Sequence, residues 1–181
     1  MTSARPTTSA RPRRVAVVGT SGSGKTTFSI RLADRLGVRH VELDAHFWQP
    51  DWQQPDRDAF NERMIAILAG LDGWVCDGNY GSIAADHADT IVWLDLPLRT
   101  CLWRVLRRAV RRARQHELLW GTNRESWSRL IGRDSLTWWV LTTHGRRRRD
   151  LTELFGAPAY RHLRRVRLLS SAEAEAWLAS V

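Results

Sequence analysis

One segment near the N-terminus combines glycine, lysine and hydroxyl side chains in a spacing that suits a chain of phosphates. It reads Gly-Thr-Ser-Gly-Ser-Gly-Lys-Thr over positions 19–26 and matches the pattern G-x-x-x-x-G-K-[S/T] at every position. Glycines let the backbone approach phosphate oxygens closely, and the exposed amides then point at the anion. The residues expected to bind phosphate are Gly19, Thr20, Ser21, Gly22, Ser23, Gly24, Lys25, Thr26 and Thr27.

Two of these residues bring chemistry of their own. Lys25 is the only lysine in the chain, and its ammonium group would reach the β- and γ-phosphates of a nucleoside triphosphate. The Thr26 hydroxyl would ligate the Mg²⁺ ion that accompanies such a ligand. The sequence therefore predicts ATP, or another nucleoside triphosphate, together with Mg²⁺.

Two aspartates follow apolar runs that read as strands. Asp77 comes directly after a tryptophan, a valine and a cysteine, where an acid commonly holds Mg²⁺ in this class of site; an ordinary turn before Gly78 is the alternative. Asp44 opens the segment that would face a phosphoryl acceptor, and its carboxylate could orient the acceptor hydroxyl or take its proton. A role as a helix cap or turn residue stays equally open for Asp44.

Arginines follow one another at helical spacing after position 98. Arg104, Arg108, Arg111 and Arg112 fall largely on one helical face. Arginines that approach a transferred phosphoryl group stabilise the negative charge of the transition state and so lower the activation barrier. We therefore expect a lid here, with Arg104 and Arg108 as candidate catalytic residues. A solvated basic face or a contact with nucleic acid is the alternative, and a second run at 146–149 is predicted to be surface.

The elements that must position these residues alternate between strand and helix. Apolar β-branched runs predict strands at 15–18, 38–43, 74–76, 90–96 and 165–169. Amphipathic spacing predicts helices at 25–36, 56–70, 98–114, 125–144 and 172–178, with a polar, aromatic loop at 44–55 and a break at 120–123. The alternation predicts an α/β fold of the P-loop NTPase type: three layers, a five-stranded mainly parallel sheet with helices on both faces, and an arginine-rich helical lid.

Composition places this domain in a broad class. The net charge is +9 and the pI about 11.1, which favours anionic partners such as nucleotides. Residues 1–14 are small, polar and basic, so we expect a disordered arm before a single domain at 15–181, with the lid region at about 104–135. No apolar run approaches a membrane span, and two cysteines without metal spacing indicate reduced thiols in a cytoplasmic protein.

Ten tryptophans are an unusual number for 181 residues. Trp48 and Trp52 lie in the acceptor-side segment, where they could stack on a ring. Four others fall on apolar stripes and are predicted to be core: Trp74, Trp93, Trp103 and Trp177. The adjacent pair at 138–139 cannot face one core together, so one of them is expected to cover a ligand or a partner subunit.

With these motifs in place, the chain resembles the adenylate-kinase-related P-loop proteins, in particular the FlaR-related "DNA topology modulation protein" group. The resemblance rests on the phosphate loop, Leu43-Asp44 with the aromatic residues after it, residues 77–80, 91–95 and 121–125, and it spans most of 14–179. It implies a P-loop kinase fold with a five-stranded parallel sheet and a lid. Adenylate kinases carry Asp-Gly-Phe-Pro-Arg where this chain has Asp-Gly-Asn-Tyr-Gly over 77–81, which leaves a non-phosphorylated hydroxyl acceptor open.

Three functional hypotheses follow. The first is an ATP- and Mg²⁺-dependent phosphotransferase that transfers the γ-phosphate to a nucleotide or other small molecule held near Asp44. The second is a nucleoside-triphosphate-binding regulator associated with nucleic acid, motivated by the basic charge, although no DNA-reading motif is visible. The third is a toxin-like kinase acting on a nucleotide sugar.

Overall fold

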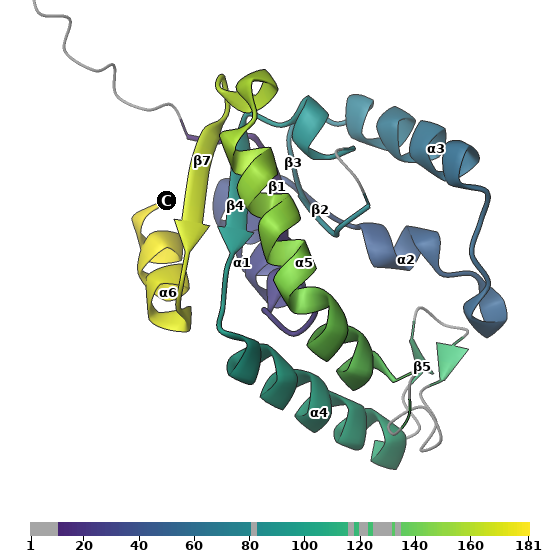
Figure 1. Cartoon of the computed structure of the whole chain (residues 1–181). Helices are drawn as coiled ribbons and strands as arrows, with labels where there is room; N and C mark the ends of the chain where they lie inside the picture. The colour runs from purple at the N-terminus through teal and green to yellow at the C-terminus, as the bar shows by residue number, and fades with distance from the viewer. Residues whose placement is uncertain (1–10, 81–82, 116–117, 120–122, 125–131, 133–134) are drawn as a thin grey trace, which may run out of the picture.

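A single parallel sheet organises the chain, as seen in a computed structural model that describes residues 11–80, 83–115, 118–119, 123–124, 132 and 135–181. Its strand order is β2-β3-β1-β4-β7, and every pair is parallel. The five strands are β1 (Arg14–Gly19), β2 (Arg39–Glu42), β3 (Trp74–Asp77), β4 (Thr90–Leu94) and β7 (Arg164–Leu168). The predicted five-stranded parallel sheet is therefore confirmed (Figure 1).

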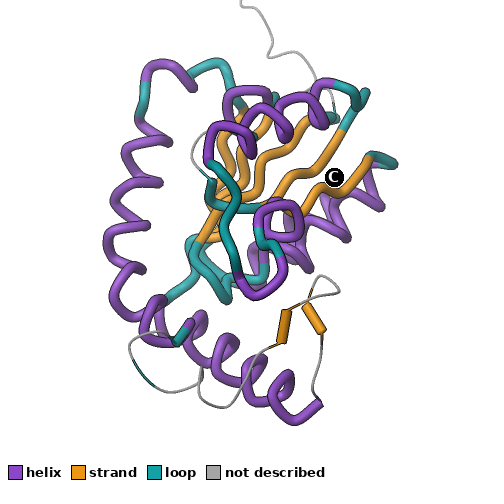
Figure 2. The backbone as a smooth tube through the Cα atoms, turned by 90° about the vertical axis from the view of Figure 1, so that its right-hand side faces the viewer, coloured by secondary structure: helices purple, strands orange, loops and turns teal. Residues whose placement is uncertain are grey.

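Helices cover both faces of this sheet, which gives three layers (Figure 2). The longer helices are α1 (Lys25–Leu36), α3 (Arg57–Ala69), α4 (Leu98–Gln115), α5 (Leu136–Gly156) and α6 (Ser171–Ser180). The short elements are α2 (Leu43–Phe47), the 3-10 turns η1 (Pro50–Trp52), η2 (Ala85–His87) and η4 (Pro158–Tyr160), and a hairpin of β5 (Leu118–Leu119) and β6 (Asn123–Arg124). None of the helices described is long and apolar enough to cross a membrane.

The core follows from the alternation of side chains along the central strand. Val15 and Val17 of β1 point to one face and pack with α1 and α6, whereas Ala16 and Val18 point to the other face and pack with α5. A third cluster joins β2 and β3 to α2 and α3 around Trp74. Because Val15–Val18 are buried on both faces of the sheet, this stretch of β1 must be apolar, as its sequence is.

The carboxyl ends of β1, β2 and β3 meet at one edge of the sheet. Strand β1 lies between β3 and β4, with Val17 beside Asp77 and Gly19 beside Leu94. Ligands of open parallel sheets bind beyond this edge, where the connections diverge to opposite faces. The loop at 19–24 and the residues that follow β2 and β3 therefore share one region.

Three expectations from the sequence are wrong. Residues 43–47 form helix α2 instead of a loop, because Leu43 and Phe47 stand one helical turn apart and both bury in the core. Trp103 is 64% exposed, because the buried stripe of α4 runs through Cys101 and Val105 on the opposite side.

The helix predicted at 125–144 is the third difference, since α5 runs from Leu136 to Gly156 and contains the arginine run at 146–149. Most of the predicted arm, the break at 120–122 and the middle of the predicted lid lie outside the described residues. Of the lid region, the structure describes the arginine-rich helix α4 and the β5–β6 hairpin.

Candidate active site

The phosphate loop connects β1 to α1 and leaves the start of that helix open. Helix α1 begins after Gly24, with no side-chain cap and no acidic residue in its first turn, so the first amides of the helix remain available to an anion. The loop also lies directly against α4: a Cβ at Gly22, where φ is +83°, would stand 2.4 Å from the Cys101 carbonyl oxygen. Glycine is required there both for conformation and for space.

The ammonium group of Lys25 lies among the charged residues of the site. Its Nζ donates to the carbonyl oxygens of Gly19 and Thr20 at 2.9 and 3.3 Å. Burial lowers the pKa of Lys25, and the carboxylates of Asp44 and Asp77 act against that shift. Two arginines, Arg108 and Arg147, lower it further, so charges from four other elements converge on this ammonium group.

Two oxygen ligands suited to Mg²⁺ stand beside the lysine. The Thr26 hydroxyl donates to Asp77 Oδ2 at 2.7 Å, and Asp77 is 3% exposed at the end of β3. A hydroxyl and a carboxylate at this separation match the hard oxygen donors that Mg²⁺ takes next to a nucleotide phosphate, so the residues fit the metal. The imidazole of His40 lies 2.7 Å from the other Asp77 oxygen, a neighbour from β2 that no local sequence pattern indicated.

Asn79 ties the end of β3 to the phosphate loop. Its Nδ2 donates to the Gly19 carbonyl at 2.7 Å, and its Oδ1 accepts from the Gly19 amide at 3.3 Å. One carboxamide therefore binds both backbone polar groups of Gly19, where the loop begins. Sequence reasoning named this residue only as part of a family pattern.

On the acceptor side, Asp44 is paired with a tyrosine. Tyr80 donates its hydroxyl to Asp44 Oδ1 at 2.5 Å, and its ring packs on Phe47 with centroids 4.4 Å apart. Burial raises the pKa of Tyr80, with the nearby Asp44 charge adding to the shift, so the phenol stays a donor. This hydrogen bond occupies Oδ1 of Asp44 and does not involve Oδ2.

Arg147 of α5 belongs to this side as well, although the run that contains it was predicted to be surface. It is half-buried, its Nη1 donates to the Asn79 carbonyl at 3.4 Å, and burial lowers its pKa. Together with Asp150 it lines a cavity of about 330 Å³ that also reaches Gly78 and Leu43. The neighbouring Arg148 binds Asp95 instead, so adjacent arginines of the run at 146–149 have different partners.

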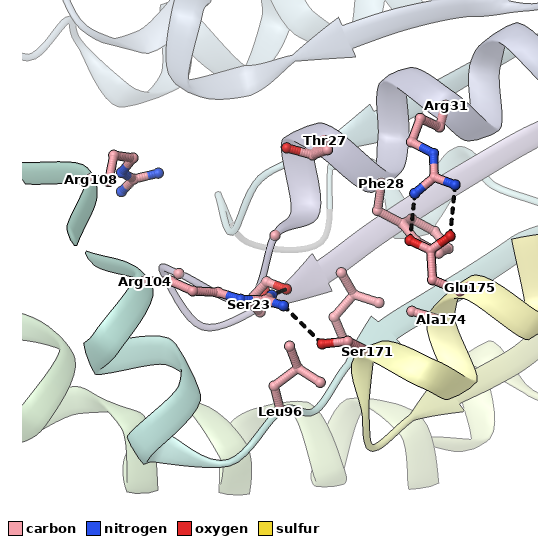
Figure 3. A pocket seen from close by; sticks show the side chains of 13 residues that line it. Ser23, Thr27, Phe28, Arg31, Leu96, Arg104, Arg108, Ser171, Ala174 and Glu175 are labelled. Carbon is pink, nitrogen blue, oxygen red and sulfur yellow. Dashed lines mark hydrogen bonds and ion pairs between the residues drawn. The ribbon is translucent and has the colours of Figure 1, made fainter. Parts of the chain in front are cut away.

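A second cavity, of about 310 Å³, opens on the other side of the phosphate loop between α1, α4 and α6 (Figure 3). Arg104 spans it, because Nη1 donates to the Ser23 carbonyl at 3.1 Å and Nη2 to Ser171 Oγ at 2.8 Å. Its far end is closed by Arg31 and Glu175, which form a two-pronged ion pair at 2.5 and 2.7 Å. The cavity begins at the loop that would hold the phosphates, which suits the nucleoside part of the same ligand.

The predicted residues thus fall into three groups around one loop. Gly22, Ser23, Gly24, Thr27, Arg104 and Arg108 line the nucleoside-sized cavity. Lys25, Thr26 and Asp77 meet at the centre, where Lys25 also feels the charge of Asp44. Residues Gly19, Thr20 and Ser21 form the strand side of the loop.

Comparison with known proteins finds kinases among the proteins with similar sequences. No family model matches the chain. It is 32% identical over 111 residues to a cytidylate kinase of Halorubrum lacusprofundi, and the match covers 52% of this chain and 57% of the relative. It is 31% identical over 107 residues to a shikimate kinase of Persephonella marina, and that match covers 49% of this chain and 64% of the relative. The chain therefore spans less than two thirds of the curated relatives that it matches.

Solved structures agree on the architecture. A shikimate kinase from Bacteroides thetaiotaomicron matches with a TM-score of 0.52 and 16% identity, over 93% of this chain and 96% of that one. A gluconokinase from Sinorhizobium meliloti 1021 matches with a TM-score of 0.50 and 18% identity, over 93% of each chain. These comparisons do not confirm the FlaR-related label, and they show that this chain has the fold of the P-loop kinases.

Proposed function

We propose that this protein is an ATP- and Mg²⁺-dependent phosphotransferase that transfers the γ-phosphate to a hydroxyl group of a nucleotide or another small molecule. One observation carries the proposal: the Thr26 hydroxyl next to Lys25 is bonded to Asp77, and the carboxylate charges of Asp77 and Asp44 both act on that lysine. In this proposal, the metal ligands, the cation that holds phosphate and the base would share one centre. Sequence similarity to cytidylate and shikimate kinases points in the same direction.

The triphosphate would lie along the loop at 19–26, with the nucleoside in the cavity that Arg104 spans. Backbone amides and Lys25 would hold the β- and γ-phosphates. Mg²⁺, held by Thr26 and Asp77, would supply positive charge that neutralises the phosphate oxygens as the reaction proceeds.

The acceptor would enter the side of Asp44 and Arg147. The carboxylate of Asp44 takes the proton of the acceptor hydroxyl while that oxygen forms a bond to the γ-phosphorus. The bond between the γ-phosphorus and the bridging oxygen of the leaving diphosphate breaks, and ADP departs with that electron pair. Arg147 suits an acceptor that itself carries a negative charge, because among the described residues its guanidinium makes one long hydrogen bond, to the Asn79 carbonyl, and has further donors to offer.

Labelled ATP and a panel of hydroxyl acceptors that includes cytidylate and shikimate test the proposal. We expect transfer to at least one acceptor, abolished by Lys25→Ala. Asp44→Asn should lower transfer by about 10²–10⁴-fold, the usual contribution of a positioned base, and should leave Mg·ATP affinity unchanged. Asp34→Asn, which alters an exposed carboxylate on α1, is the matched control. Hydrolysis without transfer to any acceptor, or full transfer by Asp44→Asn, would refute the proposal.

A further inference from the structure

The turn between α2 and α3 has a backbone that its residues do not favour. Asp51 and Trp52 have φ values of 58° and 60°, two successive non-glycine residues in the left-handed region. A residue with a Cβ adopts this region at a cost in free energy, and the cost is greater for a bulky side chain than for aspartate. Such a conformation persists where surrounding contacts hold it in place.

Asn123 of β6 supplies those contacts. Its Oδ1 accepts a hydrogen bond from the Trp52 amide at 2.9 Å, and its Nδ2 donates to the Gln49 carbonyl at 3.0 Å. The side chain is buried, with 2% of its surface exposed. Both ends of one buried carboxamide are thus used on the backbone of a single turn, more than 70 residues away in the sequence.

From this turn, ring contacts lead directly to the acceptor side of the site. The ring of Trp52 meets that of Trp48 with centroids 5.6 Å apart, and Trp48 meets Phe47 at 5.2 Å. Phe47 packs on Tyr80 at 4.4 Å, and Tyr80 binds Asp44. Each step is a packed contact, so a change in the turn can alter the position of the carboxylate.

We propose that Asn123 is a positioning residue for the acceptor. It fixes the turn at 49–53, and through the rings of Trp48 and Phe47 it sets the Tyr80–Asp44 pair. The part of this proposal that concerns the acceptor rests on the proposed function, whereas the hold of Asn123 on the turn does not.

Residue-resolved hydrogen exchange tests the hold on the turn. In Asn123→Ala the Trp52 amide should exchange about tenfold faster, as expected when a hydrogen bond of typical net strength is lost, while amides of α1 and β1 keep their rates. Asn123→Asp retains the acceptor for the Trp52 amide but loses the donor to Gln49, so Trp52 should stay protected. Gln54→Ala, an exposed neighbour, should change nothing. An unchanged Trp52 rate in Asn123→Ala, or an equal increase across α1 and β1, overturns the proposal.

Steady-state kinetics with the acceptor found in the screen tests the positioning role. Asn123→Ala should raise the KM for the acceptor about tenfold, in line with the same lost hydrogen bond, while the KM for ATP changes less than twofold. A merely structural role would lower the amount of active enzyme and leave both KM values alone, and that result overturns the positioning role. If the screen finds no acceptor, that result refutes the proposed function alone. The hydrogen-exchange experiment still tests the contact between Asn123 and the turn.

Discussion

Gly22 offers the sharpest test of how the phosphate loop is held against α4. We expect Gly22→Ala to destabilise the protein and to weaken Mg·ATP binding together. The new methyl group would stand 2.4 Å from the Cys101 carbonyl oxygen and 2.8 Å from Val105 Cγ2. The first of these is backbone and cannot turn aside, so the loop and the helix must separate.

The magnitude has two parts. A left-handed φ of +83° costs a residue with a Cβ about 1–2 kcal/mol. Forcing a methyl group into filled space costs about 1–3 kcal/mol more. We therefore expect a loss of about 2–5 kcal/mol, a large part of the stability of a typical domain. Separation of the loop from α4 should also break the bond from Arg104 to Ser23, and with it the wall of the nucleoside cavity.

Gly37 provides the matched control. It too is left-handed, with φ of +66°, but a Cβ there meets nothing within 4 Å, so Gly37→Ala should cost only the about 1–2 kcal/mol of strain. Urea denaturation gives the two free energies of unfolding, and calorimetry gives Mg·ATP affinity for each folded variant. If Gly22→Ala costs no more than Gly37→Ala and binds Mg·ATP equally well, the close packing of loop and helix is not what holds the site.

Three further predictions concern single side chains. Tyr80→Phe keeps the ring packing but removes the donor to Asp44, so kcat should fall about tenfold, as expected when one hydrogen bond that holds the carboxylate is lost, with the KM for ATP unchanged. Burial lowers the pKa of His144; the charge of Arg148 lowers it further, and the charge of Asp95 acts in the opposite direction. Near and below pH 6.5, the usual pKa of histidine, the folded state therefore binds fewer protons than the unfolded state. Stability should then fall as the pH drops below 6.5, and His144→Leu should flatten that fall in urea titrations at several pH values. Burial also raises the pKa of the Cys76 and Cys101 thiols, so a thiol reagent should label neither in the native protein at mildly alkaline pH and both in concentrated urea.

Local signals predicted the bounds of the helix that follows the phosphate loop. Helix α1 begins and ends where expected, because a glycine precedes Lys25 and Gly37 follows Leu36 in the left-handed conformation that ends helices. The start of α6 is held just as locally, because the Ser170 hydroxyl accepts from the Glu173 amide and the Glu173 carboxylate accepts from the Leu169 amide. Such features are encoded within one turn of chain.

The acceptor half depends on contacts that no local pattern contains. Tyr80 and Arg147 reach the site because β3 and α5 pack beside β2 and β1, so their roles follow from strand order. Helix α2 was missed because five residues are too few to form a helix by propensity, and burial of Leu43 and Phe47 stabilises it instead. An arginine run likewise reads as surface until one member, Arg147, is seen to turn inward.

The order of strands in the sheet has a consequence for the biosynthesis of the protein. The ribosome makes β1 first, yet its two neighbours are β3, where Trp74 pairs with Arg14, and β4, where Thr90 pairs with Val15. One edge of β1 therefore stays unpaired until β3 has emerged, and the other edge until β4 has emerged, when more than half of the chain has been made. Pairing between such distant segments is slow, so we expect nascent chains that stop before Leu94 to be targets for chaperones and unable to retain ATP.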